Sequence, residues 1–255
     1  MWLAEKSIAD NYSKIVDRCL IDSYAYNNFK NIRAYTEIVS QHPPYGQMYY
    51  DRILSEAPNE LYLKLSQIAK CDTIGNPVVD RYVNKECFTN DLIMSACNLR
   101  YVNTVMEINR CFNFGDKSIN IVELGVGFGG LCFAASQWFN INKYCLLDLE
   151  NVQALATKCL DQLGNTTHTT KTPSKIDLLI SEFCLSEFDD SLINSYYNDY
   201  VSKAERVYLR FNLHDEQRKA AFLEKIGNDF NYVVEDEWPK THWPNYVIIG
   251  TKKQK

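Results

Sequence analysis

The chain has 255 residues, of which 46% are hydrophobic and 23% are charged, and its formal net charge is −5. This composition is typical of a folded globular protein and excludes a disordered chain. The acidic balance argues against nucleic acid as a partner, because binding along phosphates needs clustered Lys and Arg. The sequence has neither a signal-peptide pattern at its start nor an apolar run long enough to cross a bilayer, so we expect no membrane insertion.

The nine cysteines are scattered along the chain and form no Cys-x-x-Cys pair. Structural zinc sites need such closely spaced pairs, and several of these cysteines lie in apolar runs, where a reduced thiol behaves as a small hydrophobic group. We therefore expect reduced cysteines, a cytoplasmic protein and no zinc site.

Residues 1–114 have the apolar spacing of helices. Hydrophobic residues recur every three or four positions over Leu3–Ile21, Tyr26–Val39, Gly46–Ser55, Asn59–Ala69 and Phe88–Asn113. Nothing in this part has the pattern of a strand of any length. We therefore predict a helical N-terminal region.

Residues 115–255 alternate between strand and helix patterns. Strands are predicted over Ile119–Leu124, Tyr144–Leu149, Ile176–Ser181, Val207–Phe211, Tyr232–Asp236 and Tyr246–Gly250. Helices are predicted over Gly130–Phe139, Val152–Leu163, Asp189–Val201 and Asp215–Phe230. This alternation favours an α/β fold with a mostly parallel sheet. The last two strands are too close in sequence for a helical crossover, so we expect them to pair antiparallel at one sheet edge.

The segment between Gly164 and Ile176 departs from this regular alternation. It is rich in Thr and contains Pro173. A parallel crossover needs about a dozen residues or more in addition to the strand that it follows. The segment is too short for both, so we expect a short strand or an extended passage at that edge of the sheet.

Glycines connect the first strand of this part to its first helix, in Glu123-Leu124-Gly125-Val126-Gly127-Phe128-Gly129-Gly130. Such a turn presents backbone N–H groups to a ligand, and it also satisfies the fingerprint of dinucleotide-binding proteins. Glu123 lies where a carboxylate can face the ammonium of an amino acid, and there it would repel a pyrophosphate. Asp148 ends the second strand, where a carboxylate can accept hydrogen bonds from ribose hydroxyls, as in dehydrogenases. The terminal antiparallel pair replaces the sixth parallel strand of a dinucleotide-binding sheet.

With the segment Asp177–Glu182, these features resemble the core of class I S-adenosylmethionine-dependent methyltransferases over residues 115–255. The resemblance implies a Rossmann-like methyltransferase sheet, preceded by a helical region that covers the substrate. Three shorter phrases, Val122–Leu131, Leu147–Glu150 and Ser186–Phe188, are similar to sugar O-methyltransferases of bacterial surface-polysaccharide clusters.

The family resemblance also implies roles for particular residues, with S-adenosyl-L-methionine as the cofactor. The expected cofactor-binding residues are Glu123, Gly125, Gly127 and Gly129 for the methionine part, Asp148 and Leu149 for the ribose and adenine, and Ser181 and Phe183 beside the reaction centre. Arg100, on the helix that leads to the glycines, is a candidate partner of the methionine carboxylate. The segment after Gly164 is too short to match the family's fold, so the resemblance does not assign the remaining residues that contact adenine.

Methyl transfer to a hydroxyl needs a base, and in open α/β sheets ligands lie beyond the carboxyl ends of the strands. Glu182, directly after a strand, is the first candidate, although it could instead orient the cofactor. His214 has a side chain suited to proton transfer near neutral pH, but it could be a surface residue. Glu187 is the third candidate base, and its alternative role is to hold a loop in place. Asp189 and Asp190 are close to these carboxylates but look like helix-start residues, so no metal is expected.

The leading hypothesis is an O-methyltransferase that acts on a hydroxyl of a sugar or nucleotide-linked sugar. Methylation of a phosphoramidate or other small acceptor in the same pathway is a close variant. A nicotinamide-dependent oxidoreductase and a catalytically silent binding subunit remain alternatives, because the glycine turn alone does not distinguish them.

Overall fold

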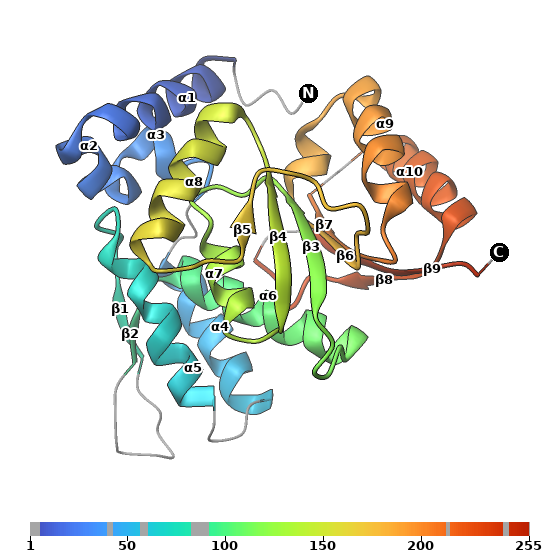
Figure 1. The fold of residues 1–255 in the computed structure, drawn as a ribbon, viewed down its shortest axis with the longest axis horizontal. Coiled ribbons are helices and arrows are strands. Elements are labelled where there is room, and N and C mark those ends of the chain that lie inside the picture. Colours follow the sequence, from blue (N-terminus) through green and yellow to red (C-terminus); the bar gives the residue numbers. More distant parts are fainter. Residues whose placement is uncertain are drawn as a thin grey trace.

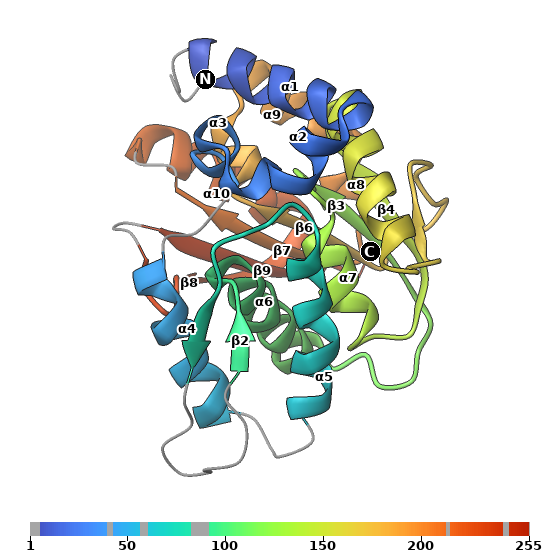
Figure 2. The ribbon, with the colours of Figure 1, turned by 90° about the vertical axis from the view of Figure 1, so that its left-hand side faces the viewer.

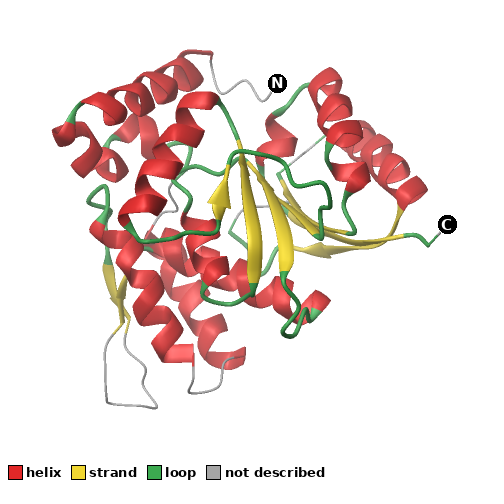
Figure 3. Ribbon diagram, viewed as in Figure 1, coloured by secondary structure: helices red, strands yellow, loops and turns green. Residues whose placement is uncertain are grey.

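The structure is a computed structural model that describes residues 6–39, 43–56, 61–82, 92–212, 215–241 and 245–254. The fold contains one large sheet with helices on both of its faces (Figures 1 and 3). Further helices come from the first half of the chain. In the described part of the chain, no helix combines the length and the apolar character needed to cross a membrane. The eight cysteines within the described ranges are all unpaired.

The first half of the chain is mainly helical, as expected. Its helices are α1 (Lys6–Ile21), α2 (Ser23–Asn28), α3 (Arg33–Thr36), α4 (Pro43–Glu56), α5 (Leu61–Ile68) and α6 (Ala96–Phe112). Two single 3-10 turns, Phe29–Asn31 and Ala69–Thr73, lie between them. The helix expected over Tyr26–Val39 is therefore divided into three short pieces.

One expectation for this half is wrong. Two short strands, β1 (Asp80–Tyr82) and β2 (Leu92–Met94), form an antiparallel pair where no strand was predicted. Leu92 and Met94 are buried while Ile93 is exposed, which is the period of a strand, and this stretch lies inside the predicted helix Phe88–Asn113. The helix instead begins after Ser95, whose Oγ accepts a hydrogen bond from the Asn98 N–H at 3.3 Å.

The second half forms the seven-stranded sheet. Its strands are β3 (Ile119–Leu124), β4 (Ile141–Leu147), β5 (His168–Thr169), β6 (Leu178–Glu182), β7 (Arg206–Phe211), β8 (Phe230–Asp236) and β9 (Tyr246–Lys252). Its helices are α7 (Gly130–Ser136), α8 (Glu150–Gln162), α9 (Asp190–Asp199) and α10 (Glu216–Asp229). The strand order is β5-β4-β3-β6-β7-β9-β8. The first five strands in this order are parallel, and β9 pairs antiparallel with β7 and β8. The predicted α/β sheet with a terminal antiparallel pair is confirmed.

The trimmed edge of the sheet is also confirmed. β5 has only two residues, which pair with Tyr144 and Cys145 of β4. Residues 170–177 are all described and contain no helix, so the chain passes directly from β5 to β6.

Two hydrophobic clusters fill the two faces of the sheet. Successive residues of a strand point to opposite faces, and Ile121 and Val122 of β3 accordingly belong to different clusters. The cluster around Ile121 includes residues from α1, α4, α6, α7 and α8, and the other includes residues from α9 and α10. The helices of the first half therefore share a core with one face of the sheet. Figure 2 shows α1, α2 and α3 together beyond one end of that sheet.

Candidate active site

The parallel strands end at one edge of the sheet, which we call the carboxyl edge. The glycine loop, Gly125–Gly129, follows β3 at this edge, and Asp148 follows β4. The N-terminal segment, residues 6–39, is fixed above it through α8. The Asn151 side-chain amide donates to Ser13 Oγ at 2.9 Å and to Asp17 Oδ1 at 2.8 Å.

The glycines of the loop are required by its backbone. Gly125 and Gly129 have φ values of +81° and +85°, a region that residues with a Cβ rarely occupy. A Cβ on Gly125 would also lie 2.5 Å from the Cys184 Cβ, and one on Gly129 would lie 2.9 Å from Leu160. Gly127 faces the N-terminal segment, because a Cβ on Gly127 would lie 3.2 Å from the Val39 side chain. The loop is thus held between the sheet edge and the helices that cover it.

Asp148 connects the loop to the end of β4. Its Oδ2 accepts from the Val126 N–H and its Oδ1 from the Leu149 N–H, both at 2.8 Å. Burial raises the pKa of Asp148, although these hydrogen bonds act in the opposite direction. A carboxylate has about four acceptor positions, so Asp148 keeps some for ribose hydroxyls. Leu149 beside it is 59% exposed and offers an apolar surface at the rim.

Glu123 lies inside the protein, with 2% of its surface exposed. Its Oε2 accepts a hydrogen bond from the Tyr144 hydroxyl at 2.8 Å. Burial raises the pKa of Glu123 well above its usual value, and the nearby charges of Glu182 and Asp148 raise it further. The carboxyl group therefore favours its neutral form until a cation comes close to it.

Glu182 is also buried, and donors already surround its carboxylate. Oε2 lies 2.6 Å from Arg100 Nη1 and 3.0 Å from Arg210 Nη1. Oε1 accepts from Thr104 Oγ1 at 3.3 Å. Arg100 is thereby engaged, but its Nε has no hydrogen-bond partner among the described residues. This arrangement makes Glu182 an anchor between α6 and the sheet.

These contacts extend into a larger group of buried charges on the α6 side of the sheet. We call it the Arg–Glu cluster, and it consists of Arg52, Arg100, Arg210, Glu107, Glu182 and Glu237. Arg210 Nη2 donates to the Tyr208 hydroxyl at 2.8 Å, which donates to Glu107 at 2.6 Å. Glu237 lies 3.9 Å from Arg210 Nε. Three buried arginine side chains thus face three buried glutamate side chains, and at the rim Glu56 and Arg110 add one further charge of each sign.

The Arg–Glu cluster reaches the connection between β8 and β9. Glu237 Oε2 accepts from Thr241 Oγ1 at 2.6 Å and from Asn245 Nδ2 at 2.9 Å, and Arg52 donates to the Trp238 carbonyl. Because β9 begins beside the end of β7, this connection lies at the carboxyl edge. Most of the cluster could not be predicted, since its charges are far apart along the chain and become neighbours only through the fold.

Ser181 lies near the end of β6, and Phe183 directly follows that strand. Ser181 is fully buried, and its Oγ accepts from the Leu185 N–H at 3.2 Å, so its hydroxyl stabilises the turn. Phe183 has a φ of +69°, and its N–H donates to the Arg210 carbonyl at 2.9 Å. A left-handed conformation costs a residue with a side chain on the order of 1–3 kcal/mol, and such residues cluster at functional sites.

Glu187 ends the 3-10 turn Cys184–Glu187 at the same edge. Its side chain is exposed, yet partial burial and the charge of Asp148 raise its pKa to about 7. Tyr12 of α1 belongs to the same neighbourhood, because burial and then the charges of Asp148 and Glu187 raise its pKa. Within the described ranges, no Lys, Arg or His forms an ion pair with Asp148 or Glu187. Asp148 and Glu187 therefore form a pair of carboxylates without a counter-cation among the described residues.

His214 and His242 lie outside the described residues. Tyr45, Tyr49, Tyr50 and Arg52 belong to α4, and all but Tyr45 are buried in the core. Among the residues that the structure describes, no group of three or more His, Cys, Asp or Glu side chains could hold a metal ion.

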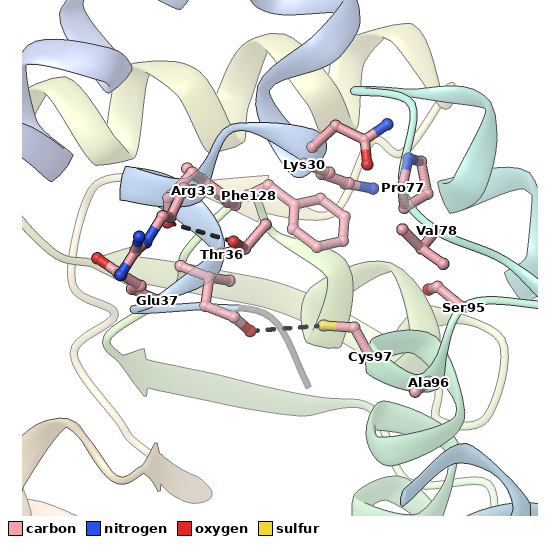
Figure 4. A pocket seen from close by; sticks show the side chains of 13 residues that line it. Lys30, Arg33, Thr36, Glu37, Pro77, Val78, Ser95, Ala96, Cys97 and Phe128 are labelled. Carbon is pink, nitrogen blue, oxygen red and sulfur yellow. Dashed lines mark hydrogen bonds and ion pairs between the residues drawn. The ribbon is translucent and has the colours of Figure 1, made fainter. Parts of the chain in front are cut away.

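A cavity of about 620 Å³ lies beside the glycine loop, within the size range of ligand pockets (Figure 4). Its walls come from the N-terminal segment, from Pro77 and Val78, from the start of α6 and from Phe128. Asp148 and Glu187 do not line it. The sequence did not indicate this cavity, because its wall joins four segments that are distant along the chain.

No model of a protein family matches the sequence, and no curated protein matches it. Parts of several solved structures are similar in fold. Mitomycin 7-O-methyltransferase is 16% identical with a TM-score of 0.47, over 62% of this chain and 57% of that enzyme. An rRNA methylase from Streptococcus thermophilus is 15% identical with a TM-score of 0.43, over 61% of this chain and 95% of the methylase. Magnesium protoporphyrin IX methyltransferase from Synechocystis is 16% identical with a TM-score of 0.46, over 62% of this chain and 84% of that enzyme.

Proposed function

We propose that this protein is an S-adenosylmethionine-dependent O-methyltransferase. The observation that carries the proposal is the acidic carboxyl edge, where Asp148 and Glu187 have no cationic partner among the described residues. A positively charged sulfonium donor is attracted to these two carboxylates. The geometry of the glycine loop fits both cofactors, and the uncompensated carboxylates favour the cationic one.

The residues of the site fit the parts of this cofactor. The glycine loop and Glu123 would hold the methionine end, and a nearby ammonium would favour the ionised form of the buried Glu123. Asp148 has acceptor positions left for the ribose hydroxyls, and the exposed Leu149 would contact the adenine. When bound, S-adenosylmethionine supplies an activated methyl group for in-line transfer to the acceptor. Alignment of the acceptor with that methyl group is then the main task of the protein.

We assign the base to Glu187. A general base works best when its pKa lies near the working pH, and the pKa of Glu187 is about 7. Glu182 is less suited, because its two oxygens already accept hydrogen bonds from Arg100, Arg210 and Thr104. We propose that Glu182 orients the site through these contacts. His214 is retained as the second candidate base.

The proposed acceptor is a hydroxyl of a sugar or nucleotide-linked sugar in bacterial surface-polysaccharide synthesis. The support is the resemblance of three short segments, one of which, Ser186–Phe188, contains the proposed base. A phosphoramidate or another small acceptor in the same pathway is the alternative, and the same site chemistry would serve it.

Incubation with methyl-labelled S-adenosylmethionine and a panel of nucleotide sugars tests this function. We expect transfer to at least one of them, and loss of transfer in Glu187→Gln with unchanged folding and retained cofactor binding. Asp190→Asn, at an exposed acid paired with Arg218, is the matched control and should transfer normally. Transfer that continues undiminished in Glu187→Gln but stops in His214→Ala would move the base to His214. Saturable binding of NAD without binding of S-adenosylmethionine would contradict the proposed function.

A further inference from the structure

We infer that the cavity beside the glycine loop is an anion-binding site, which receives a phosphate or carboxylate group through Lys30, Tyr35 and the N-terminus of α6. Figure 4 shows Lys30 and Phe128 together with Ser95, Ala96 and Cys97 around this cavity. The inference rests on the proposed function only for the choice of the nucleoside probes used to test it.

Lys30 brings a buried positive charge to the cavity wall. The residue is 8% exposed, and its Nζ donates to the Cys71 carbonyl at 2.7 Å and lies 3.6 Å from the centre of the Phe128 ring. Among the described residues, no carboxylate forms an ion pair with it. An ammonium has three N–H donors, so two remain after the bond to Cys71. The Cys71 carbonyl and the Phe128 ring compensate part of this buried charge, and an anion in the cavity would compensate it further.

The N-terminus of α6 forms a second part of the wall. This helix has 17 residues, and its dipole places a partial positive charge at its start. The Ser95 N–H donates to Asp72 Oδ2 at 2.8 Å, and Ser95 Oγ accepts from the Asn98 N–H at 3.3 Å. Among the described residues, these contacts do not use the N–H groups of Ala96 and Cys97 in the first turn of the helix. Both residues line the cavity.

Tyr35 supplies an independent donor. It lines the cavity and is 1% exposed, and its hydroxyl has no hydrogen-bond partner in the part of the chain that is described. That hydroxyl lies 4.0 Å from the position that a Cβ on Gly127 would take, so this part of the wall borders the glycine loop. Burial raises the pKa of Tyr35 well above its usual value, so the hydroxyl keeps its proton and can donate it in a hydrogen bond.

The remaining charges near the cavity leave this positive character in place. Arg33 and Glu37 both line it and pair with each other at 2.6 Å, so their charges cancel. Asp72 does not line the cavity; burial raises its pKa, and the charge of Lys30 acts in the opposite direction. An ammonium, a phenol and two backbone N–H groups therefore belong to residues that line one cavity, and donors of these kinds bind an anion with several oxygens.

Two ligands can bring such an anion, and the experiment separates them. Titration with inorganic pyrophosphate represents a phosphorylated acceptor. Titration with S-adenosylhomocysteine and with decarboxylated S-adenosylmethionine represents the amino-acid carboxylate of the cofactor, because only the second ligand lacks that group. Lys30→Met removes the charge, and Tyr35→Phe removes one hydroxyl at nearly constant shape.

We expect Lys30→Met and Tyr35→Phe each to weaken binding about 10-fold or more for the ligand whose anion occupies the cavity, as for loss of a hydrogen bond to a charged group. If the anion is the cofactor carboxylate, we expect both variants to bind decarboxylated S-adenosylmethionine as tightly as the wild type does. Lys158→Met is the matched control, since Lys158 also donates to a backbone carbonyl and lies over an aromatic ring, yet does not line this cavity. Lys158→Met should leave the affinities for pyrophosphate and for S-adenosylhomocysteine unchanged.

Unchanged affinity of both variants for pyrophosphate and for S-adenosylhomocysteine would overturn the inference. Tyr35→Phe decides the matter if Lys30→Met fails to fold, which circular dichroism would show. A wild-type protein that binds none of the nucleoside probes contradicts the proposed function, and the pyrophosphate titration then tests the cavity by itself. In that case, absence of saturable pyrophosphate binding would also overturn the anion site.

Discussion

Replacing Arg210 with Met removes the central cation of the Arg–Glu cluster. The Arg210 side chain is 2% exposed and contacts Glu182 at 3.0 Å, Glu107 at 3.6 Å and Glu237 at 3.9 Å. After the change, two arginines would face three buried glutamates. Removing one partner of a buried ion pair costs about 3–5 kcal/mol, because it leaves a buried charge uncompensated. For a chain of this size, that corresponds to a decrease in melting temperature of roughly 6–20 °C.

Urea unfolding followed by circular dichroism measures this loss. Arg218→Met is the control, since Arg218 pairs with Asp190 at 2.7 Å on the surface, and we expect that variant to lose less than about 1 kcal/mol. The double variant Arg210→Met with Glu182→Gln leaves two charges of each sign, so it should be less destabilised than the sum of the single variants. A loss in Arg210→Met no larger than in Arg218→Met would refute the balanced cluster.

Four further outcomes are expected from the site. The value of kcat/KM should rise with pH through about 7 as Glu187 loses its proton, and Glu187→Gln should abolish this rise and lower the rate by about 100-fold or more. Because the pKa of Glu187 is raised from its usual 4.5 to about 7, the folded state holds a proton that the unfolded state has released, so stability falls as pH rises through this window. Melting temperatures from pH 4.5 to 7 should therefore fall more steeply in the wild type than in Glu187→Gln. Leu149→Ser should leave urea unfolding within about 0.5 kcal/mol of the wild type, yet weaken S-adenosylhomocysteine binding about 5- to 30-fold in calorimetry, because Leu149 is 59% exposed until adenine covers it. Gly129→Ala should destabilise the protein by about 1–2 kcal/mol or more in urea unfolding, because φ at this position is +85° and the new methyl would lie 2.9 Å from Leu160.

The sequence predicted the sheet well where its signals are local. The bounds of β3 were predicted to the residue, because a buried strand that ends in glycines has a distinct pattern. The short β5 followed from counting the residues between Gly164 and Ile176. The strand pair β1–β2 was missed, because three residues are too few to show an alternation and they adjoin a long helical pattern.

The surroundings of the site residues could not be predicted in the same way. Glu182 was the first candidate base, and the fold places Arg100 and Arg210 beside its carboxylate from a helix and a neighbouring strand. Glu187 and Asp148 are far apart in sequence, and their mutual charge effect arises only where the parallel strands end together. Such effects depend on distances across the sheet, which the local pattern of a sequence does not contain.

Isothermal titration calorimetry with S-adenosylmethionine and, separately, with NAD tests the central claim most directly. Uncompensated carboxylates at this edge predict saturable binding of S-adenosylmethionine and no saturable binding of NAD. Saturable NAD binding, with no heat from S-adenosylmethionine at any pH, would contradict the account.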